Sequence, residues 1–309
     1  MASFDVPILL ITYKRLDTTQ KVLERIAQIK PSRLYISSNA PDPGKPDDNE
    51  KVLAVRSMIE KRIDWPCNVK KLYRTDHVGA GVSISSAINW FFENVEEGII
   101  LEDDTLPAIS FFNYCKLLLD KYRNEQKIKI IGGSNYSNRE IECKSTYYFT
   151  AFPHIWGWAT WKRTWSEYDF TLNSIRDDEV RDLLKKYFTR NEVIDSWVNS
   201  YNMVKDGKTF PWDFQLGFSI FKNAGINIVS AKNLVSNIGF GLEATNTKNT
   251  EDELSNATLT EVTGMIHPEK IEISKVQDRY TEMKVAESLK PRTNVKRLIS
   301  KVVNMITGK

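Results

Sequence analysis

The sequence predicts an α/β protein whose mostly parallel, Rossmann-like sheet is flanked by helices. The first observation is an uninterrupted apolar run over residues 6–11, which is typical of a strand covered on both faces. The second is a helical spacing of apolar residues between Asp17 and Pro31, and the third is another apolar run over 34–36. Strand, helix and strand in this order form a βαβ unit, in which the two strands are parallel neighbours.

The alternation of strands and helices continues to about residue 135. Residues 40–49 are dense in Pro, Gly and Asp, so we expect a loop after the second strand, at the sheet edge where open α/β sheets bind ligands. The further expected elements are a helix over 50–62, a strand over 69–72, a helix over 84–93, a strand over 98–101, a helix over 111–122 and a strand over 128–131.

The composition is that of a folded globular protein. Its 309 residues allow one large domain or two modest ones, and 41% hydrophobic with 27% charged residues exclude a disordered chain. A net charge of +3 is too small for a general nucleic-acid binder. The three cysteines form no CxxC pair and no apolar run approaches the length of a membrane span, so we expect a reducing, cytoplasmic location.

Beyond residue 136 the regular alternation stops. Five of the eight tryptophans fall between Trp156 and Trp197, so we expect this half to hold a second substrate. Residues 243–258 are polar and nearly free of large apolar groups, which predicts a mobile surface loop.

The string Glu102-Asp103-Asp104 is the most informative motif. Three consecutive carboxylates at the carboxyl end of a buried strand repel one another, which favours a nearby cation. Their hard oxygen donors suit Mg²⁺ or Mn²⁺, ions that also bind the oxygens of a diphosphate. The alternative is that the acids cap a helix that begins near Pro107. The residues alone leave both interpretations open.

Two aromatic-rich segments supply further candidates. Trp212-Asp213 places a carboxylate between aromatic groups, where desolvation raises its pKa toward the range of a general base. The alternative is that Asp213 is the N-cap of a helix over 214–221. Residues 156–165 contain four tryptophans, whose rings either stack on sugars or form ordinary core.

The chain resembles the inverting nucleotide-sugar glycosyltransferases of the A-type fold, in particular the N-acetylglucosaminyltransferase I branch, as a bacterial relative. An ordered set of motifs between residues 6 and 245 carries the resemblance. These motifs are the first strand with its Thr12-Tyr-Lys-Arg15 turn, the strand ending at Asn39, Glu102-Asp103-Asp104 as a variant of the DxD motif, Phe152-Pro with Gly157-Trp158 and Trp165, Trp212-Asp213, and the segment 237–241.

The resemblance implies a role for each matching residue. Asp104 would bind Mn²⁺ or Mg²⁺ directly, Asp213 would be the catalytic base, and Asn39 stands where the family has an acidic residue facing uracil. His267 is either an additional metal ligand or a loop residue. The residues implied to bind the nucleotide sugar are Thr12, Tyr13, Arg15, Asn39, Ser83, Glu102 and Asp103, and those implied to bind the acceptor are Gly157, Trp158 and Trp212.

The implied activity is metal-dependent, inverting sugar transfer in bacterial surface polysaccharide synthesis. The donor would be a nucleotide sugar, first of all a UDP-sugar, and the acceptor a hydroxyl of a glycan or lipid-linked glycan. Residues 1–135 would bind the donor, and residues 136–288 would bind the acceptor and carry the base. The alternatives are a nucleotidyltransferase, whose usual Gly-rich loop is absent from residues 12–17, and a non-catalytic nucleotide- or glycan-binding subunit of the same fold.

Residues 289–309 predict a separate basic amphipathic helix. Apolar residues recur at helical spacing from Val295 to Ile306, and no acidic residue follows Glu287. Such a helix suits an anionic membrane surface, so we expect peripheral association with the inner face of the cell membrane. The alternative is a helix that docks on the protein's own core or on a second subunit.

Overall fold

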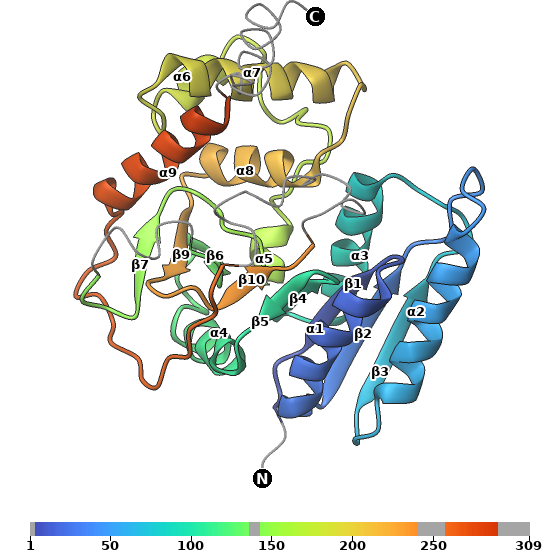
Figure 1. The fold of residues 1–309 in the computed structure, drawn as a ribbon. Helices are drawn as coiled ribbons and strands as arrows, with labels where there is room; N and C mark the ends of the chain where they lie inside the picture. Colours follow the sequence, from blue (N-terminus) through green and yellow to red (C-terminus); the bar gives the residue numbers. More distant parts are fainter. Residues whose placement is uncertain (1–3, 136–142, 240–256, 290–309) are drawn as a thin grey trace, which may run out of the picture.

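The computed structural model describes residues 4–135, 143–239 and 257–289. Within these residues, eight strands form one sheet in the order β3-β2-β1-β4-β8-β6-β9-β7, and β5 pairs with β10 in a two-stranded ribbon (Figure 1). The strands are β1 (Ile8–Thr12), β2 (Arg33–Ser38), β3 (Asn68–Tyr73), β4 (Glu97–Glu102), β5 (Thr105–Pro107), β6 (Ile128–Gly132), β7 (Tyr147–Thr150), β8 (Trp158–Trp161), β9 (Ile226–Ser230) and β10 (Val235–Asn237). The helices are α1 (Leu16–Ile29), α2 (Asp48–Arg62), α3 (Ala80–Asn94), α4 (Ile109–Lys121), α5 (Lys162–Trp165), α6 (Val180–Leu184), α7 (Asn191–Lys205), α8 (Trp212–Lys222) and α9 (Lys275–Leu289).

The order and direction of the strands confirm the predicted fold class. β1 pairs in parallel with both β2 and β4, and β2 pairs in parallel with β3. β8 lies antiparallel between β4 and β6, β6 is parallel to β9, and β7 is antiparallel to β9. The sheet is therefore mixed but mostly parallel. Each strand and helix expected up to residue 131 overlaps an observed element.

The residues of β1 explain why this run is apolar throughout. Ile8 and Leu10 pack on one face of the sheet with α1, α2 and α4, whereas Leu9 and Ile11 pack on the other face with α3 and α8. All four side chains are buried. A strand covered on both faces has no polar alternation, so the apolar run correctly predicted a central strand.

The chain beyond residue 136 adds to the same sheet. β8 is inserted between β4 and β6, so the predicted boundary at residue 135 falls within one continuous sheet. Helices α6, α7 and α9 pack with α8 around a separate apolar cluster that includes Leu184, Tyr201 and Phe218 (Figure 1). The backbone just before α8 packs on Gly81 at the start of α3, so the amino termini of α8 and α3 are close together.

Two sequence predictions concern segments that the structure does not describe. α9 ends at Leu289, so the helix predicted over 289–309 lies outside the described residues except for this first position. The polar loop predicted over 243–258 also lies outside them, apart from its last two residues. Within the described part of the chain, no helix combines the length and the apolar character needed to cross a membrane.

Candidate functional site

Two strand ends bring candidate residues together at the carboxyl edge of the sheet. β1 and β4 are parallel neighbours in register, so the turn after β1 lies beside the residues that follow β4. The Tyr13 backbone N–H donates to Asp103 Oδ2 at 3.0 Å. The Arg15 guanidinium contacts Asp104 Oδ2 directly, and its Nη1 lies 3.9 Å from Asp103 Oδ1. We call Arg15, Glu102, Asp103 and Asp104 the acidic edge.

The acidic edge carries more negative charge than its surroundings neutralise. Burial, with repulsion by Asp104 and Asp103, raises the pKa of Glu102. Burial and the Asp104 charge raise the pKa of Asp103 to about 7, although Arg15 opposes the shift. Burial raises the pKa of Asp104 as well, despite its direct contact with Arg15. One guanidinium therefore does not offset three carboxylates, and an added positive charge would stabilise their ionised forms.

The alternative that these acids cap a helix is wrong. Residues Thr105–Pro107 form β5, and α4 begins only at Ile109. The free amides of Ile109 and Ser110 donate to the Glu261 carboxylate at 2.9 and 2.7 Å. Glu261 therefore satisfies the N-terminal amides of α4, and the acidic edge has no such structural role.

A segment from far along the chain lies against the acidic edge. β10 pairs antiparallel with β5, and the N–H of Ile238 donates to the Asp104 carbonyl at 2.8 Å. A Cβ on Gly239 would lie 2.1 Å from Asp104 Oδ2 and 2.6 Å from Arg15 Nη1, so a side chain here would have to push the carboxylate and the guanidinium aside. The segment 237–241, one of the motifs of the resemblance, thus lies at the acidic edge with its residues 237–239. Its last two residues lie outside the described part.

Asp213, from the second half of the chain, lies within electrostatic range of the same edge. It is the second residue of α8, and the Phe214 N–H donates to its Oδ1 at 3.0 Å. Desolvation by nearby protein raises the pKa of Asp213, although the residue is exposed to solvent. Its charge also raises the pKa values of Glu102 and Tyr168, so these groups lie within electrostatic range. The helix-cap interpretation is wrong, because the N-cap of α8 is Pro211 and Asp213 lies within the first turn.

Much of the tryptophan cluster is core. Trp158 is 1% exposed and stacks on Trp212, with ring centroids 6.1 Å apart. The expected stacking of Trp158 on an acceptor does not fit this packing, because neither ring face is open, and Trp158 instead supports Trp212. Gly157 has a φ of +66°, and a Cβ there would lie 2.6 Å from Val235 Cγ2. Backbone conformation and packing therefore require this glycine whether or not it touches an acceptor.

Two aromatic features near Asp213 were missed by the sequence analysis. Phe170 and Phe210 stack with ring centroids 5.2 Å apart, and Phe210 is 38% exposed. Tyr168 stacks on Trp165 at 4.3 Å, and its hydroxyl lies close enough to Asp213 for that charge to raise its pKa. Phe210 could have been predicted as a candidate from the sequence, because it precedes the Trp212-Asp213 motif by two residues.

The expected nucleotide-binding residues of the first half lie around the ends of β1 and β2. Asn39 is buried, its side-chain N–H donates to the Val78 carbonyl at 2.8 Å, and its side-chain oxygen accepts from the Ala40 N–H at 3.0 Å. This amide therefore ties the end of β2 to the loop before α3. The Tyr13 hydroxyl donates to Asp48 at the start of α2. A base-facing role for Asn39 stays a prediction.

A cavity of about 440 Å³ opens beside these strand ends. It is lined by the loop after β2 and the loop before α3, with Asp42, Lys45 and His77 among the lining residues. Thr12 and Ser83, which were also expected to bind the nucleotide, are both buried. The Thr12 hydroxyl donates to the backbone of β2 at 3.1 Å, and Ser83 lies in the first turns of α3.

The oxygen donors of the acidic edge fit a divalent cation that a diphosphate helps to hold. Among the described residues, no three His, Cys, Asp or Glu side chains form a complete protein cage for a metal ion. Mg²⁺ and Mn²⁺ are usually held by one or two carboxylates together with water and substrate phosphates. Asp104 and Asp103 supply such donors where positive charge is lacking. His267 does not join them, because its Nδ1 lies 2.9 Å from the Tyr147 hydroxyl, which agrees with the loop interpretation.

No protein-family model matches this chain, and no curated protein matches it. Among solved structures, UDP-glucose pyrophosphorylase complexed with UDP-glucose is similar at a TM-score of 0.40 and 10% identity, over 75% of this chain and 93% of that chain. 4-Diphosphocytidyl-2C-methyl-D-erythritol synthase from Anaerococcus prevotii is similar at 0.35 and 12%, over 65% and 97%. HddC from Yersinia pseudotuberculosis is similar at 0.32 and 12%, over 51% and 77%.

At these identities and TM-scores, the three matches carry no argument about the activity of this chain. None of the three names is that of a glycosyltransferase, so the N-acetylglucosaminyltransferase I branch gains no support from them. The case for a function therefore rests on the residues of the site.

Proposed function

We propose that this protein is a metal-dependent, inverting glycosyltransferase that moves a sugar from a nucleotide sugar to a hydroxyl of a glycan. The observation that carries the proposal is the placement of Asp213, at the start of α8, within electrostatic range of the under-neutralised acidic edge. Glycosyl transfer needs both kinds of group close together: oxygen donors for a diphosphate-bound cation and a base for the acceptor hydroxyl.

Asp104, with Asp103 beside it, is the group that would hold Mn²⁺ or Mg²⁺. When bound, that ion neutralises the charge that develops on the leaving nucleoside diphosphate. Glu102 and Asp103 would hold the ribose and the surrounding water. The Tyr13 N–H already fixes one oxygen of Asp103, which limits the directions in which this carboxylate can turn.

Asp213 would accept the proton of the attacking hydroxyl. The pKa of Asp213 is raised toward neutral pH. A general base is most effective when its pKa lies near the working pH. The hydroxyl oxygen attacks the anomeric carbon opposite the leaving diphosphate, so the C–O bond to the acceptor forms as the bond to the diphosphate breaks. The anomeric centre inverts, and no covalent intermediate with the protein is needed.

The acceptor would lie on the α8 side of the site. Trp212, which is 7% exposed, and Gly157 remain the proposed acceptor contacts, with Trp158 behind Trp212. Phe210 adds an exposed ring, stacked on Phe170, three residues before Asp213. Such ring faces pack well against the apolar face of a sugar. A lipid-linked glycan as acceptor and an anionic membrane surface as partner of residues 289–309 are parts of the same proposal.

The experiment that tests the proposal is a screen of nucleotide sugars, UDP-sugars first, with and without Mn²⁺. We expect metal-dependent binding of one donor and, with a glycan acceptor, release of the nucleoside diphosphate with inversion at the anomeric carbon. Release of pyrophosphate from a nucleoside triphosphate and a sugar phosphate would instead indicate a nucleotidyltransferase. Tight donor binding with no turnover of either kind would indicate a binding subunit.

A further inference from the structure

Arg15 is the cation that the acidic edge already contains. Its guanidinium contacts Asp104 Oδ2, and the same Nη1 lies 3.9 Å from Asp103 Oδ1. Both members of the Arg15–Asp104 pair have side chains that are 16% exposed. The pair is therefore shielded from water but not sealed, and a small ligand can reach it.

Gly239 and Arg15 both lie close to Asp104 Oδ2. The Gly239 backbone closes one side, since a Cβ there would lie 2.1 Å from this oxygen and 2.6 Å from Arg15 Nη1. Arg15 covers another side. A divalent ion that binds this oxygen must displace the guanidinium, because the two cations also repel each other at contact distance.

Arg15 is built so that its side chain can move while its backbone stays in place. The residue directly precedes α1, and its carbonyl accepts the Thr19 N–H at 3.1 Å. A displaced guanidinium therefore remains beside the amino terminus of α1, where negative charge is favoured. A diphosphate at this edge offers the guanidinium paired oxygens that match its planar fork.

We infer that Arg15 and a divalent cation compete for Asp104, and that the displaced guanidinium then binds the diphosphate of the donor. The inference rests on the proposed function, since it needs a cation and a diphosphate at the acidic edge. It has a specific consequence. Without the diphosphate, the cation must displace the Arg15 guanidinium from Asp104, which lowers the affinity for the cation. The diphosphate offers that guanidinium a new partner, so each ligand raises the affinity for the other.

The test compares wild type with Arg15→Gln, which removes the charge, and Arg15→Lys, which keeps the charge but loses the fork. Arg62→Gln is the matched control, because Arg62 forms an exposed ion pair with Glu24 at 2.9 Å on other elements. Calorimetry measures binding of Mn²⁺ alone, of UDP alone, and of each with the other at saturation.

For Arg15→Gln we expect Mn²⁺ alone to bind about tenfold more tightly, and UDP with Mn²⁺ about tenfold more weakly, than in wild type. For Arg15→Lys we expect unchanged Mn²⁺ affinity and weaker UDP binding, because the ammonium cannot pair with two oxygens in parallel. Arg62→Gln should match wild type in all titrations. The mutual increase in affinity that we expect in wild type should shrink in Arg15→Gln.

Equal or weaker Mn²⁺ binding by Arg15→Gln would overturn the inference while leaving the proposed function standing. So would an unchanged coupling between Mn²⁺ and UDP in that variant. If Arg15→Gln fails to fold, undiminished UDP affinity in Arg15→Lys overturns the inference instead. Wild type that binds neither Mn²⁺ nor any nucleoside diphosphate would contradict the proposed function itself.

Discussion

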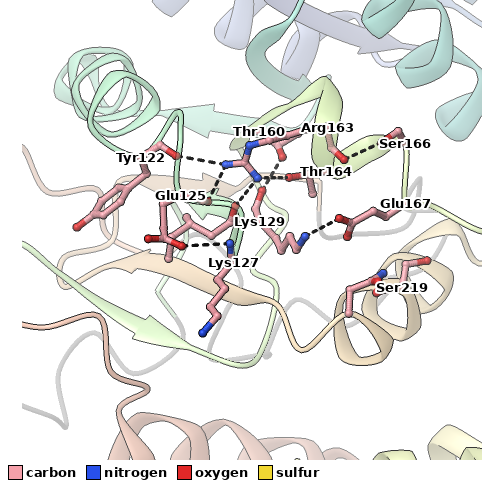
Figure 2. Close-up of polar contacts among 12 residues, drawn as sticks. Tyr122, Glu125, Lys127, Lys129, Thr160, Arg163, Thr164, Ser166, Glu167 and Ser219 are labelled. Atoms are coloured by element: carbon pink, nitrogen blue, oxygen red, sulfur yellow. Dashed lines mark hydrogen bonds and ion pairs between the residues drawn. The ribbon is translucent and has the colours of Figure 1, made fainter.

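Two partly buried charged regions of this protein differ in how their charge is balanced. In the first, which we call the matched cluster, Lys129, Arg163 and Glu167 find their partners within the protein (Figure 2). Arg163 donates to four backbone carbonyls at 2.9 to 3.3 Å, three of them between α4 and β6 and the fourth that of Ile128, the first residue of β6. Lys129, on β6, lies 2.6 Å from Glu167 Oε1.

The acidic edge is the second region, and it has three carboxylates for one guanidinium. The pKa values of its three carboxyl groups are raised. If each carboxylate had a cation beside it, these pKa values would lie near or below their usual range. The difference separates two uses of buried charge. Matched charges hold the fold together, so their loss should reduce stability, whereas unmatched charges are completed by a ligand, so their loss should reduce binding or turnover.

The largest effect is expected at the base. Asp213→Asn keeps the size and most of the hydrogen-bonding shape but removes the proton acceptor, so turnover should fall about 10²–10⁴-fold. Donor affinity should change little, because the proposed diphosphate contacts are at the acidic edge and the turn after β1, not on α8. Steady-state kinetics and donor titration measure both. Asp206→Asn, an exposed residue paired with Lys208, is the control. Turnover near wild type would show that Asp213 is only part of the helix start.

The second effect tests the acidic edge directly. Asp104→Ala should lower Mn²⁺-dependent nucleotide affinity about 100-fold, which corresponds to the roughly 3 kcal/mol of a strong charged contact. The free energy of unfolding should change little, since the lost contact with Arg15 is offset by weaker repulsion among the carboxylates. Nucleotide titration and chemical denaturation measure the two quantities, with Asp120→Ala, on the surface of α4, as control. Unchanged affinity in Mn²⁺ would refute the metal assignment.

Asp278 combines features of both regions, because it has hydrogen-bond partners within the protein but a raised pKa. Asp278 on α9 accepts from the Thr150 hydroxyl at 2.5 Å and the Ala151 N–H at 3.1 Å, yet burial raises its pKa to about 6. The folded protein thus holds this proton more tightly than the unfolded chain, whose Asp pKa is about 3.9. The contribution of Asp278 to stability is therefore largest below pH 4 and declines as the pH rises to 6.

Asp278→Asn should remove that pH dependence. As the pH rises from 4 to 7, wild type should lose up to about 3 kcal/mol relative to the variant, which is the linkage equivalent of a shift of roughly two pKa units. Urea denaturation at several pH values measures the difference. A constant difference across this range would mean that Asp278 titrates alike in the folded and unfolded chains.

The predictable part of the fold is the part built from local units. β1, α1 and β2 lie within residues 8–38, so their patterns and the crossover rule were enough to predict their pairing. The cap on α4 comes from Glu261, 152 residues away from Ile109 in the sequence. No local pattern shows such a partner, so the sequence alone cannot exclude the helix-cap interpretation of the acidic edge.

The candidate site divides in the same way. Its carboxylates were predictable, because consecutive acids after a buried strand are unusual on physical grounds. The burial of Trp158 was not predictable, since spacing shows that an aromatic ring is present but not what covers it. The approach of Gly239 to Asp104 depends on β10 pairing with β5, and the sequence analysis expected neither of these short strands.

The smallest effect is a change of stability in the matched cluster. Glu167→Gln leaves the Lys129 ammonium, which is 6% exposed, without a charged partner, and the free energy of unfolding should fall by about 1–2 kcal/mol because Glu167 itself is one-third exposed. Glu60→Gln is a close control, since its pair with Lys71 has the same 2.6 Å distance but is exposed on both sides, so its loss should cost less than about 0.5 kcal/mol. Nucleotide affinity should be unchanged in both variants. A fall in nucleotide affinity in Glu167→Gln would contradict the assignment of the matched cluster to stability and of the acidic edge to ligand binding. Equal losses of stability in the two variants would contradict it as well.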